Sequence, residues 1–208
     1  MQQKRHLAHQ SLVWGVWHSF AQIAVQASDE QLLTHLQRLA NQHGVQCRPC
    51  TTERANAKIT TQDQWSIWSE PTTDPDLCFI NADTVDALFE EMDGMYYGYD
   101  EEEGTVHFAR FEQGQMAFLW YDALRPGPSF ALTFHEDGTC TEEDARLYAL
   151  KHLNLPESTT QLDRFAFLAH LLHSHGLEHF DPHLNRATAK HTVEIVPLTA
   201  QRHFPLFP

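Results

Sequence analysis

The segment between residues 105 and 135 limits the possible folds most strongly. Three short apolar stretches, residues 105–111, 116–121 and 129–135, are separated by the turn sequences of residues 112–115 (EQGQ) and 125–128 (RPGP). Another turn sequence, residues 136–138 (EDG), follows the last stretch. Apolar segments of strand length that alternate with glycine and proline turns are typical of consecutive antiparallel strands. The sequence therefore predicts an antiparallel meander over residues 105–135.

Helical patterns surround this predicted meander. Ser28 and Gln31 form a capping box, apolar residues follow at helical spacing to Ala40, and Gly44 is a suitable end. We expect further helices from Asp83 or Thr84 to Gly94, from residue 141 to about residue 153, and over residues 160–175. The predicted fold class is α+β, with an antiparallel sheet and about four helices packed on it.

The rest of the chain is assigned from shorter patterns. Alternating apolar residues predict a strand over residues 12–20, with a continuation or second strand near residues 23–25, and further strands over residues 45–50, 77–80 and 192–196. Residues 51–76 are expected to form a long loop with at most one short strand, and residues 94–104 a flexible acidic-aromatic loop. We expect one domain over residues 1–208, with a possible subdivision near residues 51–76.

Compartment is inferred from what the sequence does not contain. The basic first residues are not followed by the apolar region of a signal peptide, and no stretch reaches the ~20 apolar residues that a membrane span needs. The four cysteines are too few and too scattered for a disulfide scaffold. We therefore expect a cytoplasmic protein that does not enter a membrane; its oligomeric state stays open.

Charge is distributed very unevenly along the chain. The formal net charge is -14, and from Ile59 to Ala109 there are thirteen Asp and Glu but no Lys or Arg. Trp, Tyr and Phe residues are interleaved with these acids. One interpretation is a solvated acidic loop whose aromatic residues lie in the core. The other is a surface that faces a basic partner. Uncompensated like charge costs folding free energy, so a chain that keeps it can be using the field to steer such a partner. Trp and Tyr are also favoured as anchors at interfaces.

The second interpretation gives the predicted function: a non-catalytic acidic protein that captures a basic protein partner. Examples are an immunity or inhibitor protein against a toxin, or a mimic of nucleic acid. The predicted partner-binding residues are Trp65, Trp68, Glu90, Glu91, Asp93, Tyr96, Tyr97, Tyr99, Asp100, Glu101, Glu102 and Glu103.

Histidine gives the alternative hypothesis, a metal-dependent hydrolytic enzyme of the zinc type. Fifteen of the 208 residues are His, and several follow one another near the C-terminus. Asp163, His170 and His173 share one flank of the predicted helix over residues 160–175, and His179 can return toward it after the turn at Gly176. Imidazole and carboxylate groups are zinc ligands. The simpler interpretation is a polar helix end, where His also suits the helix dipole.

Cys47 and Cys50 form a Cys-x-x-Cys pair, which can bind zinc or exchange thiols. The pair follows a predicted helix rather than opening one, and no second Cys-x-x-Cys is present. The simpler interpretation is that Cys47 and Cys50 are two small residues at the end of a strand. The P-loop, the dinucleotide-binding glycine pattern, the serine nucleophile elbow and a basic patch are all absent. We therefore expect no direct nucleic-acid binding and no cofactor, with zinc as the alternative.

Overall fold

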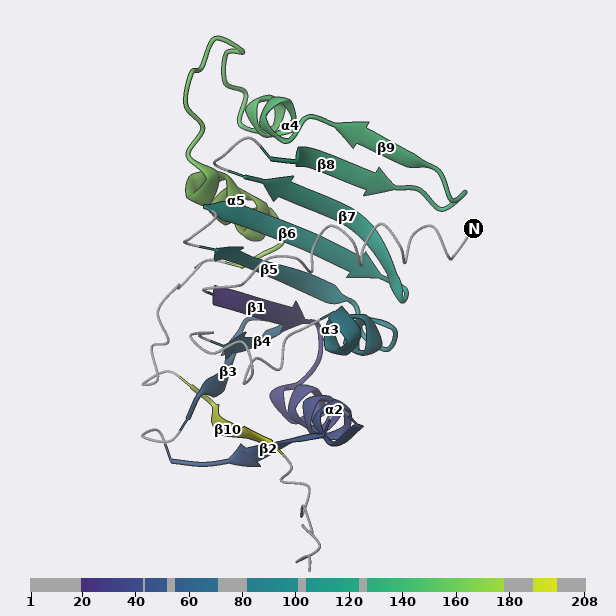
Figure 1. The fold of residues 1–208 in the computed structure, drawn as a ribbon, viewed down its shortest axis with the longest axis vertical. Helices are drawn as coiled ribbons and strands as arrows, with labels where there is room; N and C mark the ends of the chain where they lie inside the picture. The colour runs from purple at the N-terminus through teal and green to yellow at the C-terminus, as the bar shows by residue number, and fades with distance from the viewer. Residues whose placement is uncertain are drawn as a thin grey trace, which may run out of the picture.

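The computed structural model describes residues 20–42, 44–51, 55–70, 82–100, 104–123, 127–177 and 189–197. These residues form an α+β fold in which all neighbouring strands run antiparallel in one ten-stranded sheet, of order β2-β10-β3-β4-β1-β5-β6-β7-β8-β9 (Figure 1). The strands are β1 (Phe20–Val25), β2 (Val45–Pro49), β3 (Ala57–Gln62), β4 (Trp65–Glu70), β5 (Gly94–Asp100), β6 (Thr105–Glu112), β7 (Gln115–Asp122), β8 (Ser129–Phe134), β9 (Cys140–Glu143) and β10 (His191–Pro197). The helices within the described residues are α2 (Asp29–Gln42), α3 (Ala82–Phe89), α4 (Ala145–His152) and α5 (Arg164–Ser174).

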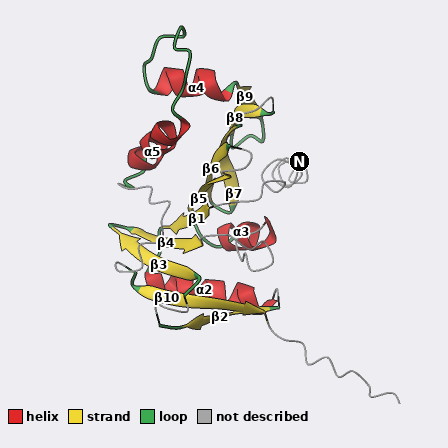
Figure 2. Cartoon of the chain, turned by 60° about the vertical axis from the view of Figure 1, so that its left-hand side comes forward, coloured by secondary structure: helices red, strands yellow, loops and turns green. Residues whose placement is uncertain are grey.

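Helices pack on both faces of the sheet. On one face, apolar residues of α2 and α3, such as Leu36 and Leu88, join a core cluster with Trp68 and Tyr96. On the other face, residues of α4 and α5 pack with Tyr97 and other strand residues. Figure 2 shows α3 on one side of strands β5 to β7 and α5 on the other. Because successive strand residues point to opposite faces, neighbours such as Tyr96 and Tyr97 belong to different cores.

The predicted meander is present as consecutive strands of this larger sheet. Strands β6, β7 and β8 pair in chain order, with Phe108 opposite Trp120 and Trp120 opposite Ala131. The hairpin then continues into β9, where Thr141 lies opposite Thr133. Residues 141–143, which we expected to open a helix, are therefore strand, and the helix begins after Asp144, whose side chain accepts a hydrogen bond from the Leu147 amide.

The predicted capping box is confirmed. The Ser28 amide donates to Oε1 of Gln31 at 3.0 Å, and the Gln31 amide donates to Oγ of Ser28 at 3.2 Å. These two bonds satisfy amide groups that have no partner within the helix, so α2 begins where the sequence predicts. Gly44 follows the helix with φ of +73°, a conformation that glycine adopts without strain.

Two segments predicted as loops are central strands. Residues 57–70 form the β3–β4 hairpin, and all residues of β4 are buried. Its polar residues, among them Ser66 and Ser69, conceal the strand pattern, because they form hydrogen bonds in the interior. Residues 94–100 form β5 between β1 and β6, rather than a flexible loop. Both faces of β5 are buried, so its sequence lacks the alternation of polar and apolar residues that marks a half-exposed strand.

Some predicted elements can be placed only in part. The strand prediction over residues 12–20 lies outside the described residues except for Phe20, and that over residues 77–80 lies wholly outside them. Strands β2 and β10 agree with the predicted strands over residues 45–50 and 192–196. The possible subdivision near residues 51–76 falls across β3 and β4, which belong to the same sheet as all other described strands. No helix in the described part of the chain is long and apolar enough to cross a membrane.

We expect Gly94→Ala to destabilise the fold, because β5 passes very close to β1 at this point. A Cβ atom at residue 94 would lie 2.3 Å from the carbonyl oxygen of Ala24 and 2.7 Å from Cε1 of Phe89. Relief of such overpacking typically costs about 1–3 kcal/mol, which urea denaturation measures. Gly44→Asn is the control, since a Cβ there meets nothing within 4 Å and Asn tolerates positive φ. Equal stability of the two variants would contradict the close approach.

Candidate functional site: an acidic rim of the sheet

The hairpin topology gathers acidic residues along one rim of the sheet. Strand β1 runs toward this rim, so in an antiparallel sheet the β3–β4, β6–β7 and β8–β9 turns and the α3–β5 connection must all lie there. With strands about 4.8 Å apart, these turns span about 30 Å. Seven exposed acids occupy them, which we call the acidic rim: Asp63, Glu90, Glu91, Asp93, Glu112, Glu136 and Asp137.

Two carboxylates of the acidic rim are paired with cations. Oε1 of Glu91 lies 2.6 Å from Nη2 of Arg38, and its Oε2 lies 2.7 Å from Nε2 of His35, both on α2. The hydrogen bond from His35, followed by the charge of Arg38, lowers the pKa of Glu91. Arg110 lies 3.2 Å from Glu112. The contacts of Glu91 attach α2 to the segment after α3, and together with the Arg110–Glu112 pair they neutralise part of the rim.

The other rim carboxylates keep their charge facing outward. Asp93 accepts a hydrogen bond of 2.6 Å from the Gln113 amide through Oδ1, which fixes the β6–β7 turn against the α3–β5 connection. Within the described residues, Asp63, Glu90 and Glu136 are exposed and form no ion pair. The rim therefore presents more negative charge to solvent than its arginines offset.

The predicted acidic surface is divided between two rims. Glu90, Glu91 and Asp93 precede β5, whereas Asp100 ends it. A strand of seven residues is about 20 Å long, so these groups lie on opposite rims rather than on one continuous surface. Glu101, Glu102 and Glu103 lie outside the described residues. This division follows directly from the correction that residues 94–100 form a strand.

The aromatic residues predicted as partner anchors lie mainly in the core. Trp65, Trp68, Tyr96 and Tyr97 are at most 5% exposed. The indole N–H of Trp65 donates to the carbonyl oxygen of His175 at 3.0 Å, and that of Trp68 donates to Glu70 at 2.6 Å. These four rings pack the two faces of the sheet and are not available to a partner in this structure, which agrees with the alternative that placed the aromatic residues in the core.

Tyr99 differs from these four residues because it is only half-buried. Its ring meets that of Phe165 edge to face, with centroids 5.4 Å apart. Phe165 is 48% exposed. Among the described aromatic residues that we predicted as anchors, Tyr99 is thus the one with part of its ring at the surface, and it lies near the rim opposite the acidic rim.

The predicted metal ligands on α5 do not converge. Asp163 is the N-cap of the helix, where its Oδ1 accepts a hydrogen bond of 3.0 Å from the Ala166 amide. His170 is seven residues further along the helix, about 10 Å along its axis, and both His170 and His173 are exposed. Of the described residues, these three form no group with metal-ligand spacing. His179 lies outside the described residues. The described residues therefore do not bring these three side chains together, and the capping bond gives Asp163 a structural role.

The Cys-x-x-Cys pair lies at the edge of the sheet. Cys47 is buried in β2, and burial, together with the charge of Glu70, raises its pKa to about 12. Cys50 is half-buried just after β2. A neutral thiol is a poor nucleophile and a poor zinc ligand, since both roles require the thiolate. Cys47 thus fits the interpretation of a small core residue.

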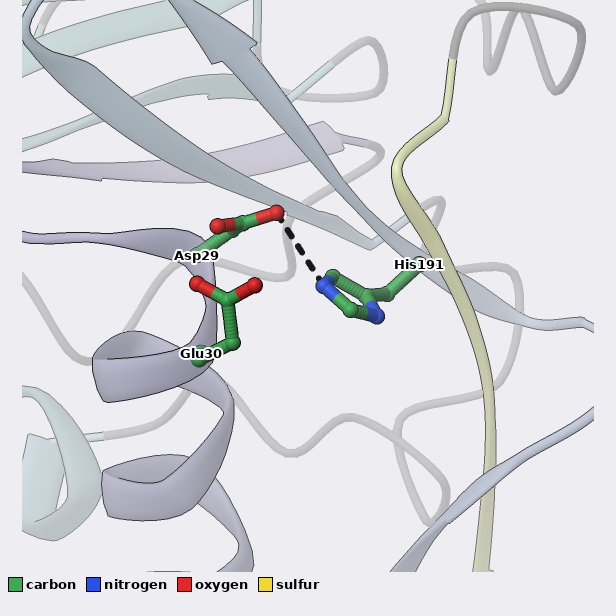
Figure 3. Close-up of side chains that lie close together, drawn as sticks. All are labelled: Asp29, Glu30 and His191. Carbon is green, nitrogen blue, oxygen red and sulfur yellow. Dashed lines mark hydrogen bonds and ion pairs between the residues drawn. The ribbon is translucent and has the colours of Figure 1, made fainter.

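The structure brings together three residues that the sequence analysis did not connect. Asp29 and Glu30 open α2, and His191 begins β10 (Figure 3). Nε2 of His191 lies 3.1 Å from Oδ2 of Asp29, and one ligand atom from each residue lies within 4.8 Å of the others. A hydrogen bond with the Glu30 carboxyl is the largest cause that lowers the pKa of Asp29; partial burial opposes this effect and the His191 hydrogen bond adds to it.

This cluster has the donor types of a zinc or manganese site, namely one imidazole and two carboxylates. Its position favours a different role. A helix N-terminus carries partial positive charge, which stabilises the carboxylates of Asp29 and Glu30 but opposes a bound cation. The hydrogen bond to His191 also already engages Asp29. We interpret the cluster as a clamp that holds the start of α2 against β10.

A row of polar residues is also buried within the sheet. Lys58, Ser69, Gln22 and Tyr97 lie opposite one another on β3, β4, β1 and β5, on the face that α4 and α5 share. Nε2 of Gln22 donates to Oγ of Ser69 at 2.6 Å. This row cannot be recognised from the sequence, because its residues are dispersed along the chain and resemble loop residues. It fixes the register of the central strands, since a shift would break this bond.

We expect Asp29→Asn to lower the free energy of unfolding by about 0.3–1 kcal/mol at pH 7. The substitution removes a negative charge that interacts favourably with the helix N-terminus and with His191. The pKa of Asp29 is lowered in the folded state, so this stabilisation is present above the unfolded value and is lost as pH falls through the folded value. The difference from the wild type should therefore shrink below pH ~4. Urea denaturation across pH measures it.

Glu157→Gln is the matched control, since Glu157 is an exposed carboxylate in the segment after α4. It should leave the stability unchanged at every pH. A difference between Asp29→Asn and the wild type that persists in acid would contradict the clamp. A rise in melting temperature on adding zinc chloride, present in the wild type and absent in Asp29→Asn, would show instead that the cluster is a metal site.

A scan against protein-family models finds no match to this chain, and searches of curated proteins and of solved structures find none either.

Proposed function

We propose that this protein is a non-catalytic binding protein that captures a basic protein partner through its acidic rim. The observation that carries the proposal is the position of the rim acids: seven exposed carboxylates in turns along about 30 Å of one side of the sheet. Potentials of opposite sign steer a partner toward such a surface and select against acidic competitors. An immunity or inhibitor protein that covers the cationic site of a toxin, or a mimic of nucleic acid, would use this arrangement.

The hairpin turns support this proposal through their rigidity. Asp93 is held by the Gln113 amide, and Asp137 accepts hydrogen bonds from the amide and the hydroxyl of Thr139 at 2.9 and 2.7 Å. Carboxylates fixed by such bonds lose less side-chain entropy when a partner binds than free side chains do. The pairing of Glu91 with Arg38 and His35 likewise orients that carboxylate before any partner arrives.

The proposal differs from the sequence prediction in how the partner is contacted. The buried rings of Trp65, Trp68, Tyr96 and Tyr97 act only as the framework that positions the rim. Contact would therefore be largely electrostatic, with rim carboxylates meeting lysine and arginine side chains. Interfaces of this kind associate quickly and weaken strongly with salt.

We expect the double variant Glu90→Gln/Glu136→Gln to weaken binding of a lysine-rich peptide by about fivefold at low ionic strength, since each exposed ion pair contributes roughly 0.2–1 kcal/mol. The effect should nearly vanish in about 0.3 M sodium chloride. Fluorescence anisotropy of the labelled peptide measures both affinities. Neither carboxylate forms an ion pair in the described structure, so folding should be unaffected.

The matched control is Glu157→Gln/Glu194→Gln, which removes the same charge at positions away from the acidic rim. Glu157 follows α4, and Glu194 lies on β10 opposite Arg48. This control should change peptide affinity less than twofold, because Coulomb attraction weakens with distance from the bound peptide. If both double variants weaken binding equally, only net charge matters and the rim is not the binding surface.

A further inference from the structure

Strand β9 is a terminal strand of the sheet and is exposed to solvent. It pairs with β8 on one side, and no other described strand lies on its other side (Figure 1). Cys140, Thr141 and Glu142 are exposed and Glu143 is half-buried. An edge strand of this kind offers backbone donors and acceptors to which another extended chain can pair.

The hydrogen-bond pattern of the β8–β9 hairpin shows which part of β9 faces outward. The His135 amide donates to the Thr139 carbonyl at 3.0 Å. Because pairs that exchange hydrogen bonds recur at every second residue of an antiparallel ladder, Thr141 and Glu143 bond toward β8. The backbone N–H and C=O of Glu142 must therefore point away from the sheet.

The charge around β9 determines what can pair with it. Residues 136–144 contain five acids and no base: Glu136, Asp137, Glu142, Glu143 and Asp144. Two of them already have structural roles, since Glu143 pairs with Lys151 and Asp144 caps α4. Glu136 and Glu142 remain exposed without an ion pair in the described structure. The turn before β9 and Glu142 therefore present negative charge, which continues into the acidic rim through Glu136 and Asp137.

The negative charge near β9 favours one kind of partner strand over another. A second copy of the chain that paired β9 with β9 would bring like charges together, which is unfavourable for residues directly opposite or diagonal across a ladder. A basic segment would instead place lysine or arginine beside these carboxylates. The other edge strand, β2, suits a basic segment poorly, because it carries Arg48 and ends at Pro49, which has no backbone N–H.

We propose that β9 is the docking strand for a basic, extended segment of the partner, which adds to the sheet next to β9 while its cations contact the acids of residues 136–142. This inference rests on the proposed function and assigns a geometry to it. The backbone of Glu142 supplies register and directional hydrogen bonds, and the acidic rim supplies attraction. Acids on an edge strand also discourage pairing between copies, so the same charges select for one class of strand and against another.

The test uses the full chain and a short strand-forming peptide in which lysine alternates with valine and threonine. Glu142→Pro removes the outward N–H together with the charge, and it leaves the bonds toward β8 in place because Glu142 does not make them. Glu142→Gln removes the charge alone and is the matched control. A twin peptide methylated at every backbone nitrogen keeps the charges but cannot donate backbone hydrogen bonds.

We expect Glu142→Pro to weaken peptide binding about tenfold and Glu142→Gln about twofold, and the methylated twin to bind the wild-type protein about tenfold more weakly than its parent. Circular dichroism and thermal melting check that the variants fold. If Glu142→Pro does not fold, comparing the binding of the two peptides to the wild-type protein still tests strand addition. Equal binding of both peptides would overturn strand addition and leave the proposed function standing. Absence of any salt-dependent binding of the parent peptide would overturn the proposed function itself.

Discussion

Both faces of the central strands are buried, and this burial decides where charged side chains can lie. Every residue of β4 is buried, as are residues 21–25 of β1 and 94–98 of β5, and helices pack on both faces of the sheet. An unpaired charge cannot be tolerated in such an interior. Two polar side chains that do lie there form hydrogen bonds, from Nε2 of Gln22 to Ser69 and from Trp68 to Glu70. The excess of acids must therefore lie where strands end and turn.

Because of this burial, the topology of the sheet decides on which rim the acidic residues lie. An antiparallel sheet sends alternate connections to opposite rims, so the acids of the β3–β4, β6–β7 and β8–β9 turns and of the α3–β5 connection lie on one side. Arg38 and Arg110 reach two of them. The acids before and after β5 are separated by the length of that strand. The acidic rim is thus a negative surface whose extent is set by topology, and the basic partner that we propose would recognise it by its electrostatic field.

The sequence predicts those parts of the fold that depend on local interactions. The capping box needs only Ser28 and Gln31, and the meander needs only turns between neighbouring strands, so both could be inferred. The strands β3, β4 and β5 could not, because their alternation is erased when both faces are buried and because their partners are distant in the chain. Gly94, expected to end a helix, is required instead for close contact with β1. His191 and Asp29 are 162 residues apart, and nothing in one sequence connects them.

The acids were recognised as a candidate surface from charge alone, but the division of that surface between two rims required knowledge of β5.

A backbone amide NMR titration with the lysine-rich peptide locates the contact surface without altering the protein. If the acidic rim and β9 bind the peptide, the shifted amides will be confined to the turns near residues 63, 90–93, 112–115 and 135–139 and to β9, and the shifts will fade as salt is added. Shifts centred on α5 or on the rim around Asp100, or shifts scattered evenly over the surface, would contradict the assignment of binding to the acidic rim.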